Sequence, residues 1–257
     1  MSAQLDPPGD RTDVDRPDVD RTGVQPPDLR WQPSVDVDGI RYDRAVVRTE
    51  WILPGDDLGR VLCDHVGGQV RPGDLAIVSE KVAIISAGFG VPVAQVQVSP
   101  LAQRLAGWVR PTAGSRGLSI PEKMQYVLKE AGHARILVAT AIAGLTRPLG
   151  IRGAFYLVAG RPARAMDGLR PPFEELLLPS LPPGVALRMA RTLAAAVGTP
   201  VAIVDMNDRG GSIRAVSHPV IAKRRLRRVL ADNPLGQRDT RTPIGLVRPA
   251  GLAVSRA

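Results

Sequence analysis

Residues 182–205 read PPGVALRMARTLAAAVGTPVAIVD. The stretch 185–197 follows two prolines, carries its apolar residues at helical spacing and ends at Gly198, a pattern typical of a helix with a glycine C-cap. The β-branched run 201–204 then predicts a buried strand, and Asp205 stands at its end. The segment therefore predicts a helix that leads directly into a strand whose last position is polar.

The rest of the chain shows both hairpin-like strand pairs and strands separated by helices. We therefore expect an α+β fold, with mixed or antiparallel sheets and flanking helices, in preference to a doubly wound parallel sheet. The sequence predicts helices over 58–66, 119–132 and 219–231, and strands or β-like stretches over 42–52, 75–78, 82–86 and 135–143, with a hairpin formed by 155–159 and 163–166.

The N-terminal segment differs from the remainder in charge and composition. Residues 1–35 contain seven Asp and four Arg, a formal balance of −3. The whole chain has a formal net charge of +9, so the remaining residues carry a charge of +12. Such a segment has too little apolar surface to offset the entropy lost on ordering. We expect a disordered acidic tail over 1–34, a folded domain over 35–248 that is either single or made of two intertwined subdomains, and a C-terminal tail over 249–257.

Several classes of protein are disfavoured by the composition. The single Cys63 cannot form an internal disulfide, and the N-terminus lacks a signal-peptide pattern. The longest apolar run, 136–145, is half of the roughly 20 residues that a membrane-spanning helix needs. We expect a cytoplasmic protein with no membrane span.

The usual nucleotide-binding and hydrolase motifs are absent from the sequence. There is no P-loop, no Gly-x-Gly-x-x-Gly fingerprint, no His-Glu-x-x-His and no Gly-x-Ser-x-Gly. The three histidines lie far apart in sequence, so we expect structural or surface roles for them. No catalytic residue can be named from these patterns.

The sharpest cluster of chemically useful side chains is the stretch 205–211, Asp-Met-Asn-Asp-Arg-Gly-Gly. The oxygens of Asp205, Asn207 and Asp208 are ligands that suit a hard divalent cation bridging to phosphate. The alternative is an Asx-rich turn, because Asp and Asn side chains readily bond to their own backbone. The pattern alone leaves both interpretations open.

A basic run, Lys-Arg-Arg-Leu-Arg-Arg, occupies residues 223–228. Apolar residues recur through it at three- and four-residue steps, which favours an amphipathic helix whose arginines form the solvated face. Contact with nucleic acid is the alternative, but the chain has no recognised module and only 4% aromatic residues, so we rank it last.

Several segments, taken in order, resemble the coenzyme F-420-0:L-glutamate ligase (γ-glutamyl ligase) family, in a divergent form. The resemblance covers about 35–248 and rests on LPGDDL (53–58), GDLAIVSEK (73–81), PEKMQ (121–125), GIRGAFYLVAG (150–160), DMNDRG (205–210) and NPLGQ (233–237).

The resemblance implies a particular α+β fold, a homodimer and an amide-forming reaction. The family joins L-glutamate to a phosphorylated acidic acceptor, the deazaflavin coenzyme F-420-0, using GTP or ATP and a divalent metal, Mn²⁺ or Mg²⁺. By this likeness Asp205, Asn207 and Asp208 would hold the metal. Lys81 would match the family's basic residue after the early strand and contact the nucleotide, with Arg147 and Arg152 facing the phosphates from neighbouring strand ends.

The sequence also departs from the family pattern. Where typical ligases have an acidic metal ligand, residues 143–149 read Ala-Gly-Leu-Thr-Arg-Pro-Leu. The alternative function is therefore a non-catalytic homologue that binds a nucleotide or another phosphoanion and has lost ligase activity.

Overall fold

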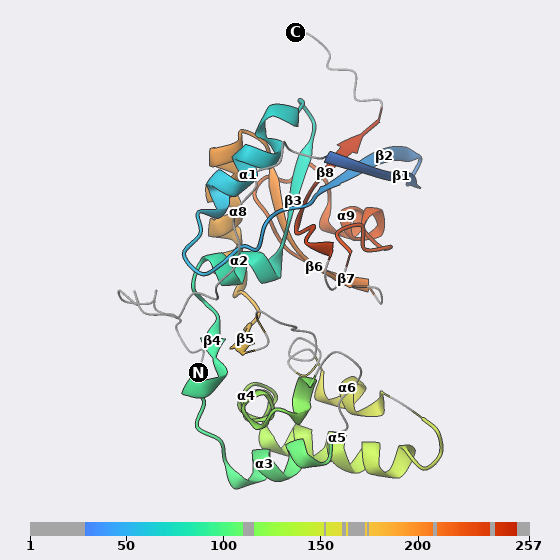
Figure 1. The fold of residues 1–257 in the computed structure, drawn as a ribbon. Coiled ribbons are helices and arrows are strands. Elements are labelled where there is room, and N and C mark those ends of the chain that lie inside the picture. The colour runs from blue at the N-terminus through green and yellow to red at the C-terminus, as the bar shows by residue number, and fades with distance from the viewer. Residues whose placement is uncertain are drawn as a thin grey trace. The chain divides into compact units, whose positions relative to one another are not determined.

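The computed structural model describes residues 29–109, 116–151, 153–160, 163, 173, 175–207, 210–236 and 240–250. The chain divides into two compact units (Figure 1). We call Met1–Gly88 with Leu181–Ala257 the sheet unit, and Phe89–Ser180 the helical unit.

The sheet unit is built on a six-stranded mixed sheet in the order β1-β2-β8-β3-β6-β7. Its strands are β1 (Leu29–Val37), β2 (Ile40–Val47), β3 (Leu75–Ser79), β6 (Val201–Asn207), β7 (Gly210–Val216) and β8 (Ile244–Pro249). β3 and β6 pair in parallel, whereas the other neighbouring strands are antiparallel. The parallel pair requires a crossover connection, which here includes the whole helical unit.

Helices cover both faces of this sheet (Figure 1). α1 (Leu58–Val66) and α8 (Pro183–Val197) pack against each other, and α8 also contacts β6 and β7. The 3₁₀ turn η1 (Gly67–Gln69) follows α1, and α2 (Glu80–Ser86) begins directly at the end of β3. α9 (Lys223–Val229) contacts β7 and β1. The expected α+β class, with a mixed sheet and flanking helices, is therefore confirmed.

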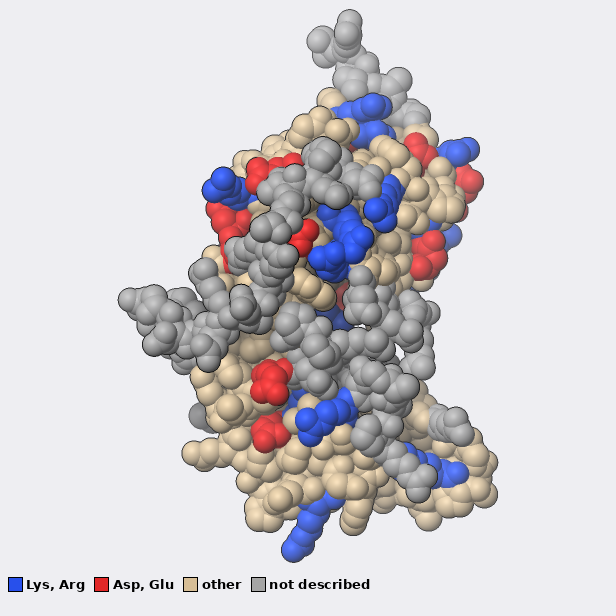
Figure 2. Space-filling view, in the orientation of Figure 1, with Lys and Arg blue, Asp and Glu red and all other residues tan. Residues whose placement is uncertain are grey.

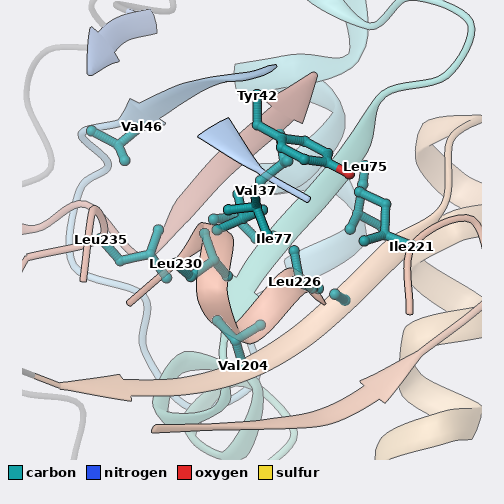
Figure 3. Packing of buried hydrophobic residues seen from close by; sticks show 13 residues of the cluster. Val37, Tyr42, Val46, Leu75, Ile77, Val204, Ile221, Leu226, Leu230 and Leu235 are labelled. Carbon is teal, nitrogen blue, oxygen red and sulfur yellow. The ribbon is translucent and has the colours of Figure 1, made fainter. Parts of the chain in front are cut away.

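One hydrophobic cluster joins α9 to the sheet. Figure 3 shows Leu226 and Leu230 in this cluster with Ile77 of β3 and Val204 of β6. Residues 202 and 204 belong to the cluster, whereas the equally buried residues 201 and 203 do not. This alternation is expected because successive side chains of a strand point to opposite faces of the sheet.

A buried arginine connects α9 to the first two strands. Arg44 of β2 is 1% exposed and donates to the carbonyl oxygens of Pro33 and Val229 at 2.7 and 2.9 Å. It also binds both carboxylate oxygens of Asp232, and this contact lowers the pKa of the Asp232 carboxyl. The guanidinium thus satisfies two backbone carbonyls and one carboxylate at the point where β1, β2 and the end of α9 meet.

The helical unit has its own core. It comprises η2 (Val93–Gln95), α3 (Pro100–Gly107), η3 (Gly117–Ser119), α4 (Pro121–Ala131), α5 (His133–Thr146) and α6 (Ala154–Ala159), with a small sheet of β4 (Val91–Pro92) and β5 (Leu176–Leu177). Side chains from α3, α4 and α5, among them Leu105, Met124, Leu128 and Ile136, are buried together.

Three segments predicted as β structure are helical. Residues 82–86 lie in α2, 135–143 in α5 and 155–159 in α6, so these predictions were wrong. A short apolar run has the same appearance in a buried strand and in a buried helix, and the packing partners decide between them. In α5, Ile136 and Ala139 are buried at a spacing of three residues, as one helix face requires. In the predicted hairpin, residues 164–166 lie outside the described residues.

Other predicted elements are confirmed with shifted ends. The helices at 58–66, 119–132 and 185–197 correspond to α1, α4 and α8, whereas the helix predicted over 219–231 is limited to α9. The strand at 75–78 is β3, and that at 201–204 continues as β6 to Asn207 because it pairs with β7.

The predicted N-terminal boundary needs correction. β1 begins at Leu29, so residues 29–34, assigned to the tail, belong to the sheet. Their pairing with β2 contains a register shift between Gln32 and Val35, which obscures the alternation in the sequence. The C-terminal boundary lies at the end of β8, and residues 1–28 and 251–257 are outside the described part of the chain.

Candidate functional site

A group of polar side chains lies where the two parallel strands end. The register pairs Ser79 with Val204, so Glu80 and Asp205 follow at the same edge of the sheet. The carboxyl ends of neighbouring parallel strands are where open α/β sheets bind their ligands. This end of the β3–β6 pair, which we call the carboxyl edge, is the candidate site.

Glu80 is the buried centre of this edge. It is the first residue of α2 and is 4% exposed. One carboxylate oxygen, Oε1, accepts hydrogen bonds from the backbone N–H of Leu181 at 2.7 Å and from Arg214 Nε at 2.8 Å. Arg214, on β7, also donates to the carbonyl oxygen of Leu181 at 2.7 Å. One ion pair therefore links the start of α2, β7 and the segment before α8.

The electrostatic environment raises the pKa of the Glu80 carboxyl. Burial is the largest cause, and the negative charge of Asp205 acts in the same direction. The Leu181 N–H and the Arg214 guanidinium oppose both effects without cancelling them. The influence of Asp205 indicates that the two carboxylates of the edge are close enough to interact.

Asp205 and Ser212 are the polar groups of the edge with unused bonding capacity. They face each other directly in the β6–β7 ladder, so their side chains lie on the same face of the sheet, about 5 Å apart at Cβ. Asp205 is half-buried and has no hydrogen-bond or ion-pair partner among the described residues. The Ser212 hydroxyl is buried and is likewise without a hydrogen-bond partner in that part of the chain. A ligand that supplies a cation or a polar atom would satisfy both groups.

Gly211 is needed for this pairing. A Cβ built at Gly211 would lie 2.2 Å from the carbonyl oxygen of Asp205 and 2.7 Å from the Met206 Cα. Both atoms belong to the backbone and cannot move aside like the end of a flexible side chain. The second glycine of the sequence cluster therefore allows β7 to approach β6 closely beside Asp205.

The structure describes four of the six site residues predicted from the sequence, and they belong to both units. Lys81 is exposed next to Glu80, and Asn207 is exposed at the last position of β6, so both lie in the sheet unit with Asp205. Asp208 and Arg152 lie outside the described residues. Arg147 is exposed at the C-cap of α5 in the helical unit. Its predicted place at a strand end was wrong because the preceding segment is a helix.

The fold bears on the two interpretations of 205–211, a metal site and an Asx-rich turn. Asp205 and Asn207 lie in β6, opposite Ser212 and Gly210, and residues 208–209 lie outside the described residues. Asp205 is therefore a strand residue and not part of an Asx-rich turn. Within the described ranges, no three His, Cys, Asp or Glu side chains lie close enough together to hold a metal ion.

Sequence reasoning missed Glu80, Ser212 and Arg214. A signal for Glu80 was present, since it stands two positions after the apolar run 75–78 of β3, much as Asp205 follows the run 201–204 of β6. Arg214 carries no such signal, because its partner is distant in sequence. Only the β6–β7 hairpin brings it to the carboxyl edge.

Two of the three histidines and the cysteine have hydrogen-bond partners elsewhere. His65 Nδ1 lies 2.8 Å from the carbonyl oxygen of Val61, and His218 Nδ1 lies 3.1 Å from the Ser217 hydroxyl. Cys63 is half-buried and its sulfur lies 3.1 Å from the carbonyl oxygen of Ala196. These side chains do not contribute to the carboxyl edge.

Comparison with known proteins adds no assignment: neither the protein-family models nor the curated proteins contain a match to this chain. Among the described residues, no helix has the length and apolar character needed to cross a membrane.

The raised pKa of Glu80 predicts a pH-dependent stability. Below its ordinary pKa of 4.5 the carboxyl is protonated in both the folded and the unfolded chain, and its contribution to folding is fully present. As the pH rises through the higher pKa of the folded state, the group must ionise while buried, and this contribution is lost. Because glutamine does not titrate, the free energy of unfolding of the wild type minus that of Glu80→Gln should fall with rising pH.

Urea unfolding of both proteins from about pH 4 to about pH 8 would measure this difference. A difference that increases with pH would contradict the prediction, and would mean that Arg214 outweighs the cost of burying the charge.

Proposed function

We propose that the chain is a γ-glutamyl ligase that depends on a nucleoside triphosphate and a divalent metal. The acceptor would be a phosphorylated acidic small molecule such as the deazaflavin coenzyme F-420-0. The observation that supports this most directly is the half-buried Asp205, without a partner among the described residues and facing Ser212 at the carboxyl edge. The resemblance of the ordered sequence segments to the ligase family gives the reaction class.

The residues of the edge suit the demands of this reaction. The terminal phosphoryl group of GTP or ATP passes to a carboxylate of the acceptor, and the glutamate amine then attacks the activated carbon and releases phosphate and a proton. Mn²⁺ or Mg²⁺ bound by Asp205, Asn207 and Asp208 would neutralise part of the triphosphate charge. Lys81 would contact the phosphates.

Glu80 has two proposed roles in the same reaction. Its bonds to Arg214 and Leu181 fix the position of β7 relative to α2, and so support the side chains around Asp205. Its raised pKa also makes it a better proton acceptor than an ordinary carboxylate. A base of that kind can take the proton that the glutamate amine must lose.

The second candidate is a homologue that binds a nucleotide or another phosphoanion without catalysis. Residues 143–149 favour it, because the end of α5 has Thr146 and Arg147 where the resembling ligases have an acidic metal ligand. The described residues also contain no group of three potential metal-ligating side chains of the His, Cys, Asp or Glu type. In both candidate functions the protein binds phosphate groups. Only the ligase goes on to form an amide bond.

Binding and catalysis can be tested in one series of variants. Asp205→Asn keeps the size of the side chain but removes its charge, so we expect Mn²⁺ affinity to fall about tenfold or more. Lys81→Ala should weaken binding of GTP or ATP about tenfold and leave Mn²⁺ binding unchanged. Asp64→Asn is the matched control, because it removes the same charge from the exposed surface of α1. Calorimetric titration of Mn²⁺, and then of nucleotide with Mn²⁺ present, measures both affinities.

Release of phosphate that requires both glutamate and coenzyme F-420-0 would support the ligase. Nucleotide binding without such release would support the non-catalytic candidate. If the wild type binds neither ligand, or if Asp205→Asn binds both as well as the wild type, the site assignment is wrong.

We also propose that the protein forms a homodimer through the helical unit. Seven large apolar side chains among the described residues of this unit are exposed: Trp108, Leu137, Val138, Leu145, Leu149, Ile151 and Leu157. Leu145 and Leu157 are 74% and 73% exposed. Because contiguous exposed apolar surface is uncommon on monomers, these side chains favour an interface with a second copy.

Analytical ultracentrifugation tests the proposed dimer. The wild type should sediment as a dimer, and Leu145→Glu with Leu157→Glu should sediment as a monomer, because a buried glutamate without a partner is costly. Ala195→Glu, on an exposed position of α8 in the sheet unit, should remain dimeric. A wild type that is monomeric at every concentration would refute the dimer.

A further inference from the structure

The seven-residue helix α9 carries two sets of basic side chains with different surroundings. Arg225 and Arg228 both bind the carboxylate of Asp38, in the turn between β1 and β2. Their guanidinium groups lower the pKa of that carboxyl. The charge of this set is therefore partly neutralised within the protein.

The second set is Lys223, Arg224 and Arg227. Lys223 and Arg227 are separated by four residues, and Arg224 and Arg227 by three, so the three side chains are neighbours on the helix surface. Arg224 and Arg227 are exposed and have no hydrogen-bond or ion-pair partner in the described part of the chain. Lys223 Nζ donates to the carbonyl oxygen of Arg214 at 3.2 Å, which leaves further N–H donors on the same ammonium group.

These three cations surround a hollow in the surface. Together with Ser212 and Ile213 of β7 they line an open depression of about 410 Å³, which we call the basic depression. In Figure 2, Lys and Arg side chains lie at several places on the visible face of the sheet unit, some of them beside Asp or Glu. Because like charges repel, three neighbouring cations with no acidic lining residue form a favourable place for an anion.

The last strand of the sheet, β7, borders this depression. β7 is the last strand in the sheet order, so part of its backbone N–H and C=O groups have no partner within the sheet. The bond from Lys223 to the Arg214 carbonyl indicates that this free edge faces the side chains of α9. Backbone N–H groups together with arginines are the donors that phosphate oxygens use most often.

We propose that the basic depression binds the phosphate groups of a small polyphosphorylated molecule. Its cations lie within two turns of one short helix, so they can reach one or two adjacent phosphates. The basic run does not form a continuous stripe for a nucleic-acid backbone, because Arg225 and Arg228 are bound to Asp38. The depression shares Ser212 with the carboxyl edge, but its cations are none of the residues assigned above to the metal or the nucleotide, so the proposal does not depend on the ligase activity.

The test uses inorganic pyrophosphate as the probe, with a chelator present so that no divalent metal contributes. Calorimetric titration of the full chain should show saturable binding that weakens as salt is added. The variant Arg224→Ala/Arg227→Ala should bind about tenfold more weakly or worse, whereas Arg224→Lys/Arg227→Lys should retain part of the affinity. Circular dichroism of each variant checks that the fold is intact.

The matched control is Arg225→Ala/Arg228→Ala, which removes the same charge from the same helix. It should bind pyrophosphate within about twofold of the wild type, since these arginines already have Asp38 as a partner. Asp205→Asn should also bind normally, which separates this site from the proposed metal site.

Three results would overturn the proposal. The first is a wild type that does not bind pyrophosphate, and the second is an equal loss of affinity in the two double-alanine variants, which would mean that only net charge matters. The third is a single-stranded oligonucleotide that binds more tightly than pyrophosphate and loses affinity in both double-alanine variants, because the whole basic run would then serve nucleic acid.

Discussion

The buried ion pair between Glu80 and Arg214 is the interaction on which the carboxyl edge depends. A carboxylate taken out of water is tolerated only when a charge and hydrogen bonds compensate for its lost hydration. Arg214 supplies the charge, and the Leu181 N–H supplies a hydrogen bond to the same oxygen. Removing one partner of such a pair costs about 3–5 kcal/mol, so α2, β7 and the start of the segment leading to α8 are held in one arrangement.

This arrangement explains why polar groups without partners can persist beside it. Buried hydroxyls and carboxylates in folded proteins almost always find hydrogen-bond partners, and an exception needs an explanation. At the carboxyl edge, the Ser212 hydroxyl is such an exception among the described residues, and Asp205 stands directly opposite it. A bound ligand would account both for these groups and for the position of the pair, at the end of two parallel strands. The close approach of β7 at Gly211 fixes the spacing between the two side chains.

The part of this arrangement that is local in sequence could be predicted. Gly198 and the apolar run after it predict α8 and β6, and the polar cluster 205–211 makes Asp205 a candidate ligand at the end of that run. The helical nature of α5 could not be predicted, because its apolar run of β-branched residues and alanines fits a strand equally well until Ile136 and Ala139 find their partners in the core. The role of Arg214 as the partner of Glu80 could not be predicted for a different reason. Its role is set by Glu80 and Leu181, and no local pattern marks contacts over such sequence separations.

Paramagnetic broadening of backbone amide signals by Mn²⁺ tests the central claim most directly, because it locates a bound cation without assuming any activity. The account predicts that, in the full chain, substoichiometric Mn²⁺ first broadens the amides of Glu80, Lys81, Asp205 and Ser212, and that Asp205→Asn removes this effect. Broadening confined to the acidic residues near the N-terminus, or unchanged at the carboxyl edge in Asp205→Asn, would contradict it.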